Sequence, residues 1–446
     1  MTVKTKGRHT FWHDYKIVVE FFLLCFLLVN TFLNNNSMNK LIGLKREFKP
    51  GFREEASKED EESRYLSLED DGRCGSWQQA YRQYASEMLQ LPPEMQRLAV
   101  FSAERSGLCD RLTSAVTIFY VALLTKRAFK IEWKNLAPLE SAFDQPNINW
   151  TTSPSDMDPT LGAVKTRQYY TNKIVPEWHS LNDYFSRENL TQRDADVRTL
   201  AFELNQGQIW TLFENPNHKR DLEAMGLLPE TAFGCAMHFL FSPRPETLAV
   251  MKETWQEIWP YISERKRRKL LPLLPEINNS QYATELLIGV QVRLGDWVFS
   301  NPDQCKTAFQ QDDFTCSMFK CADYLSNSVN ASTKFVLISD CVGIRWAAKE
   351  YYGDRLITYL SDLTEVSHVE QNRSLETLRL AASELWLFSM TDYQIITRDS
   401  SFGRVGAFLS LGWHQIHTMY PGRSYTECDL LKFSQWQELR SEWTKI

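Results

Sequence analysis

Hydrophobic residues between positions 98 and 133 form two short runs with a longer run between them. The short runs are Leu98–Ala103 and Phe129–Trp133, and the longer run is Asp110–Ala128. Apolar runs of about 4–8 residues are typical of buried strands, and longer apolar stretches are typical of buried helices. The pattern therefore predicts a strand, a largely buried helix and a second strand, which together make a βαβ unit.

A second series of strand-like runs begins after position 285. Its members are Leu286–Arg293, Lys334–Asp340, Arg355–Leu360 and Tyr393–Arg398. Helical stretches separate the last three. Between the two series, from Asn135 to Lys269, the pattern contains helix-like pieces such as Thr247–Trp259 and few clear strands.

One helical stretch of the second series has a regular apolar face. Its residues are Leu375, Leu378, Ala382 and Leu385. Spacings of three and four predict a helix packed against the sheet. Alternating strands and helices predict an α/β protein with two doubly wound, Rossmann-like lobes. We assign the N-terminal lobe to residues 73–280 and the C-terminal lobe to residues 281–446.

The N-terminal pattern is of another kind. Ile17–Leu33 is a mostly apolar run preceded by basic residues, and about 17–25 apolar residues are needed to span a membrane. Basic residues before the run favour a cytoplasmic N-terminus. We expect a cytoplasmic tail at residues 1–16 and a signal-anchor transmembrane helix at residues 17–33. Glu20 leaves a cleaved signal peptide or a buried helix as alternatives, because acids inside membranes are unfavourable.

Residues 34–72 are dense in charge and lack apolar periodicity, so they predict a solvated lumenal stem. Sequons of the form Asn-x-Ser/Thr begin at Asn35, Asn149, Asn189, Asn278, Asn330 and Asn372. The cysteines beyond the anchor, for which we expect disulfides, are Cys74, Cys109, Cys235, Cys305, Cys316, Cys321, Cys341 and Cys428. This layout predicts a single-pass type II membrane protein of the Golgi or endoplasmic reticulum with a lumenal catalytic domain.

Composition adds one exclusion. Hydrophobic residues make up 43% of the 446 residues, which is enough for large packed cores. The formal net charge is −6. Proteins that bind nucleic acids concentrate positive charge, so we expect no nucleic-acid partner.

Polar residues follow three of the predicted C-terminal strands. Arg293 ends the first strand and Asp340 the second. Ser400 and Ser401 lie in Arg398–Arg404, which follows the fourth strand and opens a helix. Ligands of doubly wound sheets bind at the carboxyl ends of the strands. Arginine binds pyrophosphate with two donors, a carboxylate accepts from a guanine edge and a helix N-terminus binds phosphate, so the three groups suit a nucleoside diphosphate.

Each of these residues also has a purely structural explanation. Arg293 and Asp296 suit an ion pair at the end of a strand. Asp340 suits a turn, and Ser400 and Ser401 suit helix N-caps. The nucleotide hypothesis rests on the location of all three groups at one edge of the predicted sheet.

The ordered motifs GVQVRLGD, FVLISD and DYQIITRDSSFGR resemble those of the fucosyltransferase superfamily that includes the α1,2-, α1,6- and protein O-fucosyltransferases. The upstream segment FSAERSGLCDRLTSAVTIFYVALLTKRAFKIEW resembles the Gly-rich turn and helix of the same superfamily. The resemblance covers residues 98–133 and 286–411 and leaves the middle of the chain unmatched. It implies a GT-B-like fold and metal-independent, inverting transfer of fucose from GDP-fucose to a glycan or glycoprotein.

The resemblance also implies a donor site in the C-terminal lobe and an acceptor site in the N-terminal lobe. The implied donor-site residues are Asp110, Arg111, Gln291, Arg293, Asp340, Ser400, Ser401 and Phe402. Among them, Arg293 is expected to hold the β-phosphate and Asp340 the guanine. Gln291 stands where many members have His, and Leu294 replaces a second Arg. Cys109 takes the place of a glycine, and Asp110 that of an asparagine.

The predicted chemistry follows from charge. Negative charge accumulates on the departing diphosphate, so a preorganised cation lowers the barrier. Arg293 fits this role without a metal. A general base should accept the proton of the acceptor hydroxyl. Asp296 and Asp110 are the candidates, and either is also a possible structural partner of an arginine.

Three other functions remain open. A GT-A enzyme would bind a metal through an Asp-x-Asp such as Asp156–Asp158 or Asp194–Asp196, although neither follows an apolar strand. A GT-B enzyme with another nucleotide-sugar donor is the second. The third is a glycan-binding protein with a decayed donor site, which Cys109 and Leu294 suggest.

Overall fold

A computed structural model describes residues 73–420, except 104–105, 170–177, 275–283, 296–297, 299–308, 310–312, 330, 361–372 and 413–414. The described residues all belong to one unit, Glu62–Ile446. The predicted tail, signal anchor and stem lie outside the described residues.

The first sheet is parallel and has four strands in the order β2-β1-β5-β4. Its strands are β1 (Leu98–Ala103), β2 (Ala128–Trp133), β4 (Val164–Tyr169) and β5 (Thr199–Leu204). The two strands predicted from the apolar runs are confirmed. The other two come from the middle section, where the pattern predicted few strands. The edge strand β4, VKTRQY, is mostly polar and so carries no apolar signal.

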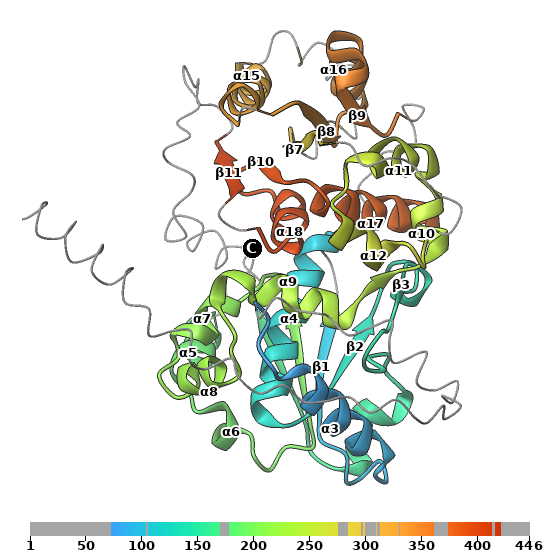
Figure 1. Ribbon diagram of the computed structural model, residues 1–446. Coiled ribbons are helices and arrows are strands. Elements are labelled where there is room, and N and C mark those ends of the chain that lie inside the picture. Colours follow the sequence, from blue (N-terminus) through green and yellow to red (C-terminus); the bar gives the residue numbers. More distant parts are fainter. Residues whose placement is uncertain are drawn as a thin grey trace, which may run out of the picture. The chain divides into compact units, whose positions relative to one another are not determined.

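The helix predicted between the first two strands is confirmed as α4 (Leu108–Thr125), which is buried along almost its whole length. Figure 1 shows α4 packed beside β1 and β2. It is also the one described helix that is long and apolar enough to cross a membrane, but 94% of it is buried inside the protein. We therefore interpret α4 as a core helix.

The second sheet is parallel and has five strands in the order β11-β10-β7-β8-β9. They are β7 (Leu286–Val292), β8 (Thr333–Ser339), β9 (Leu356–Thr358), β10 (Tyr393–Thr397) and β11 (Ile416–Met419). The four predicted strands are confirmed, and β11 was not predicted. The helices that accompany this sheet are α15 (Asp313–Ser328), α16 (Val342–Tyr352), α17 (Leu375–Ser389) and α18 (Ser401–Leu409).

The predicted apolar face of α17 is confirmed except at its first residue. Leu378, Ala382 and Leu385 are at most 2% exposed, whereas Leu375 is 36% exposed because it lies at the open end of the helix. The α/β class with parallel sheets is thus confirmed.

Smaller elements complete the described fold. They are α3 (Gln78–Gln90), α5 (Trp178–Arg187), α6 (Leu190–Arg193), α7 (Ile209–Glu214), α8 (Lys219–Ala224), α9 (Pro229–Leu240), α10 (Pro245–Ala249), α11 (Lys252–Ile258), α12 (Glu264–Leu270) and the antiparallel pair β3 (Phe143–Asp144) and β6 (Ser242–Pro243). The single helix expected over Thr247–Trp259 is therefore interrupted between α10 and α11.

Residues before the predicted boundary at residue 280 contact helices that accompany the second sheet. In α11, Trp255 Nε1 donates to Ser383 Oγ of α17 at 3.0 Å. In α12, Lys266 Nζ donates to the carbonyl of Met390 at 3.0 Å. The chain therefore reaches the helices of the second sheet before residue 280, and one hydrophobic cluster includes residues that flank both sheets.

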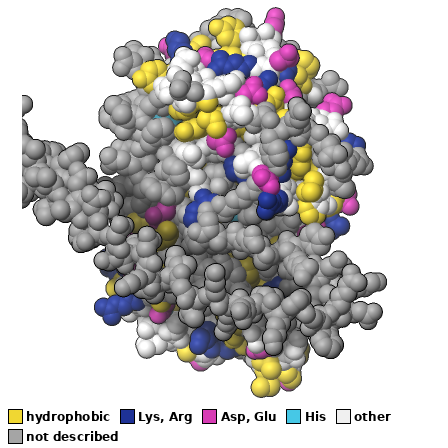
Figure 2. Space-filling model, in the orientation of Figure 1, with side chains coloured by type: hydrophobic (Ala, Val, Ile, Leu, Met, Phe, Trp, Pro, Cys, Tyr) yellow, Lys and Arg dark blue, Asp and Glu magenta, His cyan; other side chains and the backbone are white. Residues whose placement is uncertain are grey.

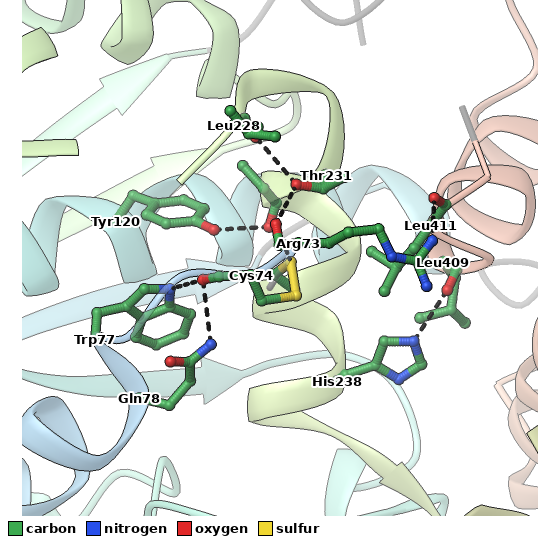
Figure 3. Close-up of a disulfide and its surroundings, with 12 residues drawn as sticks. Arg73, Cys74, Trp77, Gln78, Tyr120, Leu228, Thr231, His238, Leu409 and Leu411 are labelled. Atoms are coloured by element: carbon green, nitrogen blue, oxygen red, sulfur yellow. Dashed lines mark hydrogen bonds between the residues drawn. A yellow bond between two sulfur atoms is a disulfide. The ribbon is translucent and has the colours of Figure 1, made fainter. Parts of the chain in front are cut away.

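Cys74 and Cys235 form a disulfide that joins the start of the described chain to α9 (Figure 3). Beside it, Thr231 Oγ1 donates to the Arg73 carbonyl at 2.8 Å, and Arg73 Nη1 donates to the Leu411 carbonyl at 2.9 Å. Leu411 follows α18, so this region fastens segments that flank the two sheets.

The expectation of disulfides holds for four of the described cysteines. Cys321 and Cys341 are disulfide-bonded, as are Cys74 and Cys235. It is wrong for Cys109 and Cys316, which are free thiols. The remaining two cysteines lie outside the described residues.

On the face shown in Figure 2, basic and acidic side chains are interspersed among the described residues.

Two of the predicted sequons belong to the described part of the chain. Asn149 is exposed, and Asn189 is partly exposed beside α6.

Candidate functional site

Arg293 and Asp340 meet at the carboxyl edge of the second sheet. Arg293 directly follows β7, Asp340 directly follows β8, and Arg293 Nη1 lies 3.0 Å from Asp340 Oδ2. The side chain of Asp340 is 4% exposed and that of Arg293 is 26% exposed. The pair therefore anchors one end of the guanidinium in the protein and leaves part of it accessible.

Backbone amides complete the surroundings of Asp340. Leu294 N and Gly295 N each donate to its carboxylate at 3.0 Å. Gly295 has φ of 111°, a conformation that favours glycine, and this turn directs its amide to the carboxylate. Burial raises the pKa of the Asp340 carboxyl above its usual range, whereas Arg293 and the two amides oppose the shift.

These contacts bear on the predicted role of Asp340. A guanine edge would compete with Arg293 and with the amides of Leu294 and Gly295 for a carboxylate that is almost fully buried. The geometry favours Asp340 as the residue that orients Arg293. Its contact with guanine stays a prediction, and Asp296, the other acidic candidate nearby, lies outside the described residues.

Gln291 connects β7 to the start of α18. Its Oε1 accepts from Thr397 N at 3.1 Å, and its Nε2 donates to Ser400 Oγ at 3.1 Å. A Cβ on Gly403 would lie 2.3 Å from Gln291 Oε1, so any larger residue at that position would displace the Gln291 side chain. The structure gives Gln291, which is buried, the role of positioning the helix.

Ser400 is the N-cap of α18, as the structural explanation expected, because its Oγ accepts from Gly403 N at 3.3 Å. The next residue, Ser401, has a different partner. Its Oγ donates to Oδ1 of Asp110, in the first turn of α4. The N-termini of two helices, one beside each sheet, therefore meet at the candidate site. Phe402 is partly buried and packs against the main hydrophobic cluster.

Cys109 precedes Asp110 and is buried between charged groups. Burial raises the pKa of its thiol well above the usual range, and Asp110 adds to the rise. Arg293 and Arg404 oppose it, so both arginines lie within electrostatic range of the N-terminus of α4. Cys109 is therefore a neutral thiol at neutral pH. The site brings together Asp110, Arg293, Ser401 and Arg404.

Arg111 was predicted to join the donor site, but its described contacts hold the first sheet. It is fully buried, Nε donates to the Ser106 carbonyl at 3.0 Å, and Nη1 donates to the Lys134 carbonyl at 2.7 Å. The guanidinium also stacks on Trp133, 5.0 Å from the ring centroid. These contacts brace the loops that precede α4 and follow β2.

The two Asp-x-Asp segments have structural roles. Asp156 accepts from Ser153 N at 2.8 Å and caps a short helix. Asp194 pairs with Lys165 and Arg167 at 2.7 and 2.9 Å. Within the part of the chain that the structure describes, no group of three or more His, Cys, Asp or Glu side chains is arranged to hold a metal ion.

Two residues of the site were missed from the sequence. Arg404 is buried in α18, and Arg293 N donates to Thr397 Oγ1 at 2.9 Å, which fixes the backbone of Arg293 to β10. Thr397 ends a predicted strand and so carried a position signal. Arg404 ends the motif DYQIITRDSSFGR, but its place in the site was not predicted, because only the folding of α18 onto α4 brings it near Cys109.

No known protein-family model and no curated protein matches this chain. Solved structures similar to it include fucosyltransferases. FUT1 of Arabidopsis thaliana, a mutant in complex with GDP, has a TM-score of 0.48 and 18% identity and covers 84% of this chain and 82% of its own. NodZ from Bradyrhizobium has a TM-score of 0.43 and 15% identity, with 74% and 97% covered. POFUT1 in complex with GDP-fucose has a TM-score of 0.39 and 9% identity, with 74% and 99% covered.

Proposed function

We propose that this protein is a glycosyltransferase that transfers fucose from GDP-fucose to a glycan or glycoprotein, with inversion and without a metal ion. The observation that carries the proposal is the position of the Arg293 guanidinium. Its guanidinium is held by a buried carboxylate at the carboxyl edge of a parallel sheet and lies within electrostatic range of the N-terminus of α4. An oriented, partly exposed cation at this edge suits a diphosphate.

The N-terminus of α18 adds to this anion site. Its first turn contains Ser401 and Arg404 and no acidic side chain of its own, so the helix dipole would favour a phosphate there, next to the Asp110 carboxylate that accepts from Ser401 Oγ. As the bond between fucose and GDP breaks, charge grows on the β-phosphate. A cation that is already in place stabilises this charge without reorganisation.

We assign the proton transfer on the acceptor side to Asp110 or Asp296, and the contacts favour Asp110. Its carboxylate accepts from Ser401 Oγ and is partly exposed. Asp110 therefore belongs to α4, beside the first sheet, yet contacts the helix proposed to bind phosphate. A base in this position would face the junction of donor and acceptor.

We further propose that the protein is a type II membrane protein of the Golgi or endoplasmic reticulum whose catalytic domain is lumenal. The apolar segment 17–33, the sequons and the disulfides support this location. If it is correct, removal of N-glycans from the full-length protein should increase its gel mobility. Unchanged mobility would contradict the lumenal assignment.

The activity is tested with the purified full-length chain in detergent, GDP-fucose and a panel of glycans and folded peptide domains. We expect an acceptor to gain the mass of one fucose. EDTA should leave the rate unchanged, and a loss restored by Mn²⁺ would support the metal-dependent alternative. Transfer from another nucleotide sugar only would support the second alternative, and GDP binding without transfer would support the glycan-binding protein.

A further inference from the structure

A buried ion pair lies behind the strand end that carries Asp340. Arg345 is in α16 and Glu384 is in α17, and their side chains are 1% and 8% exposed. Arg345 Nη1 donates to Glu384 Oε1. A buried ion pair is a weak source of stability, because desolvation of both charges offsets their attraction. Its contacts therefore point to another role.

The guanidinium of Arg345 grips the last residue of β8. Nε donates to the Ser339 carbonyl at 3.0 Å, and Nη2 donates to the same oxygen. Nη1 also donates to the Tyr359 carbonyl at 3.3 Å. Two donors on one oxygen fix its position and its direction.

These hydrogen bonds from Arg345 take the place of strand pairing that is absent at the end of β8. β9 ends at Thr358, which pairs with Leu337, whereas β8 continues to Ser339. Beyond this last pair, the guanidinium donates to the carbonyl of Ser339, which ends β8, and to that of Tyr359, which directly follows β9. Arg345 therefore extends the ordered edge of the sheet at the place where β8 turns into the candidate site.

We propose that Arg345, oriented by Glu384, is a positioning residue for the donor site. Asp340 is joined to Ser339 by one peptide bond, and it orients Arg293 through contacts of about 3 Å. A displacement of Ser339 by about 1 Å would break them, and misplacements of that size lower rates by up to ~10²-fold. The effect on catalysis rests on the proposed function, whereas the effect on Asp340 does not.

The other end of the same strand provides a control, an ion pair that is more exposed than Arg345–Glu384. Near the amino end of β8, Arg355 Nη2 donates to Thr333 Oγ1 at 3.2 Å, and its Nη1 pairs with Asp323 at 3.0 Å. This pair fastens the opposite end of β8 from Asp340. Asp323→Asn therefore removes the carboxylate of an arginine pair in the same lobe without touching the proposed positioning contacts.

The test compares Glu384→Gln with Asp323→Asn in the full-length protein. We expect Glu384→Gln to raise the Kd of GDP about 10-fold, a size typical of lost support behind a binding residue. The KM for GDP-fucose should rise with it, and Asp323→Asn should change neither by more than about 2-fold. Equal effects of the two variants would overturn the proposal.

Amide hydrogen exchange without ligand separates this proposal from the proposed function. Exchange at Leu294 and Gly295, whose amides donate to Asp340, should accelerate in Glu384→Gln and not in Asp323→Asn. If the wild-type protein fails to bind GDP, the proposed function fails, but the exchange comparison still decides the positioning role. Unchanged exchange in Glu384→Gln would overturn that role.

A double variant, Arg345→Met with Glu384→Leu, covers the case in which Glu384→Gln does not fold. Replacing both members of a buried ion pair by apolar residues often leaves the stability of a protein unchanged or raises it. The double variant still removes the two donors to the Ser339 carbonyl. We expect a melting temperature near that of the wild type together with weak GDP binding and fast exchange at Leu294 and Gly295. Wild-type affinity and slow exchange would show that the pair serves stability alone, whereas failure of the double variant to fold would show that it is needed for the fold.

Discussion

Each parallel sheet carries an arginine paired with a buried aspartate, and the two pairs differ in their surroundings. Arg167 and Asp194 are 2.9 Å apart in the first sheet, and Arg293 and Asp340 are 3.0 Å apart in the second. The aspartates are 1% and 4% exposed. Distance and burial alone would therefore assign them the same role.

The remaining donors distinguish the two aspartates. Burial by itself raises the pKa of Asp194, but hydrogen bonds from Lys165 and Arg167, the charge of Arg167 and a hydrogen bond from Tyr184 outweigh it and leave that pKa lowered. Burial raises the pKa of Asp340, and one arginine with two backbone amides does not outweigh it. Asp194 forms ion pairs with two cations, Lys165 and Arg167. Asp340 pairs with Arg293, which is partly exposed.

Location adds to the difference. Asp194 precedes β5, at the amino edge of the first sheet, while Asp340 follows β8, at the carboxyl edge of the second. Ligands bind at carboxyl edges. We infer that the first pair stabilises the fold and that the second holds a cation ready for an anionic ligand.

The largest expected difference is in turnover. Arg293→Lys keeps the charge but loses the planar two-donor geometry, and loss of a preorganised donor typically lowers rates by ~10²–10³-fold. We expect fucose transfer to fall by that amount while the melting temperature changes little. Arg167→Lys is the control and should leave turnover near wild type. An Arg293→Lys enzyme with wild-type turnover would show that this arginine is structural.

The next largest effect concerns stability at neutral pH. A lowered pKa means that the ionised Asp194 stabilises the fold above the ordinary carboxyl pKa of about 3.9, and this contribution is lost as pH falls through its folded pKa. For Asp340 the sign is reversed, because the raised pKa stabilises the fold only at low pH. Urea unfolding at pH 7 should show a loss of about 3 kcal/mol for Asp194→Asn and a smaller loss for Asp340→Asn. The reverse order would remove the distinction between the pairs.

A smaller effect tests the contact between the two helix N-termini. Ser401→Ala removes the hydrogen bond to Asp110, and we expect the free energy of unfolding to fall by about 1 kcal/mol. Asp110→Asn should cost less stability, because its amide oxygen still accepts, but it should slow transfer if Asp110 is the base. Denaturant unfolding and turnover of both variants separate the two roles. A larger stability loss in Asp110→Asn would contradict this assignment.

The smallest expected effect is a pH dependence in the first lobe. His218 is buried, its Nε2 accepts from Leu190 N at 2.8 Å, and burial lowers its pKa. A lowered histidine pKa means that stability is fully present above the ordinary pKa of about 6.5 and declines as pH falls below it. The slope from one group is at most about 1.4 kcal/mol per pH unit. Urea unfolding between pH 7.5 and 5.5 should show this decline in the wild type and less of it in His218→Gln.

The sequence alone determined the elements that carry an apolar signal. The strands at Leu98–Ala103 and Leu286–Val292 and the helix α4 are buried along almost their whole length, so most of their residues are apolar. The sequence also placed Arg293, Asp340 and Ser400 after strands. The apolar run before each residue shows where the strand ends, and no knowledge of other segments is needed.

Only the tertiary structure decided which of these residues meet. The partner of Arg293 is 47 positions away in the sequence, and that of Ser401 is 291 positions away. Contacts over such sequence separations produce no local pattern of residues. Strand β4 was missed because it is polar, since an edge strand needs no apolar residues on its open side. Apolar periodicity indicates burial, and this signal lies within the sequence of each segment. Ion pairing depends instead on where two separate segments lie in the folded protein.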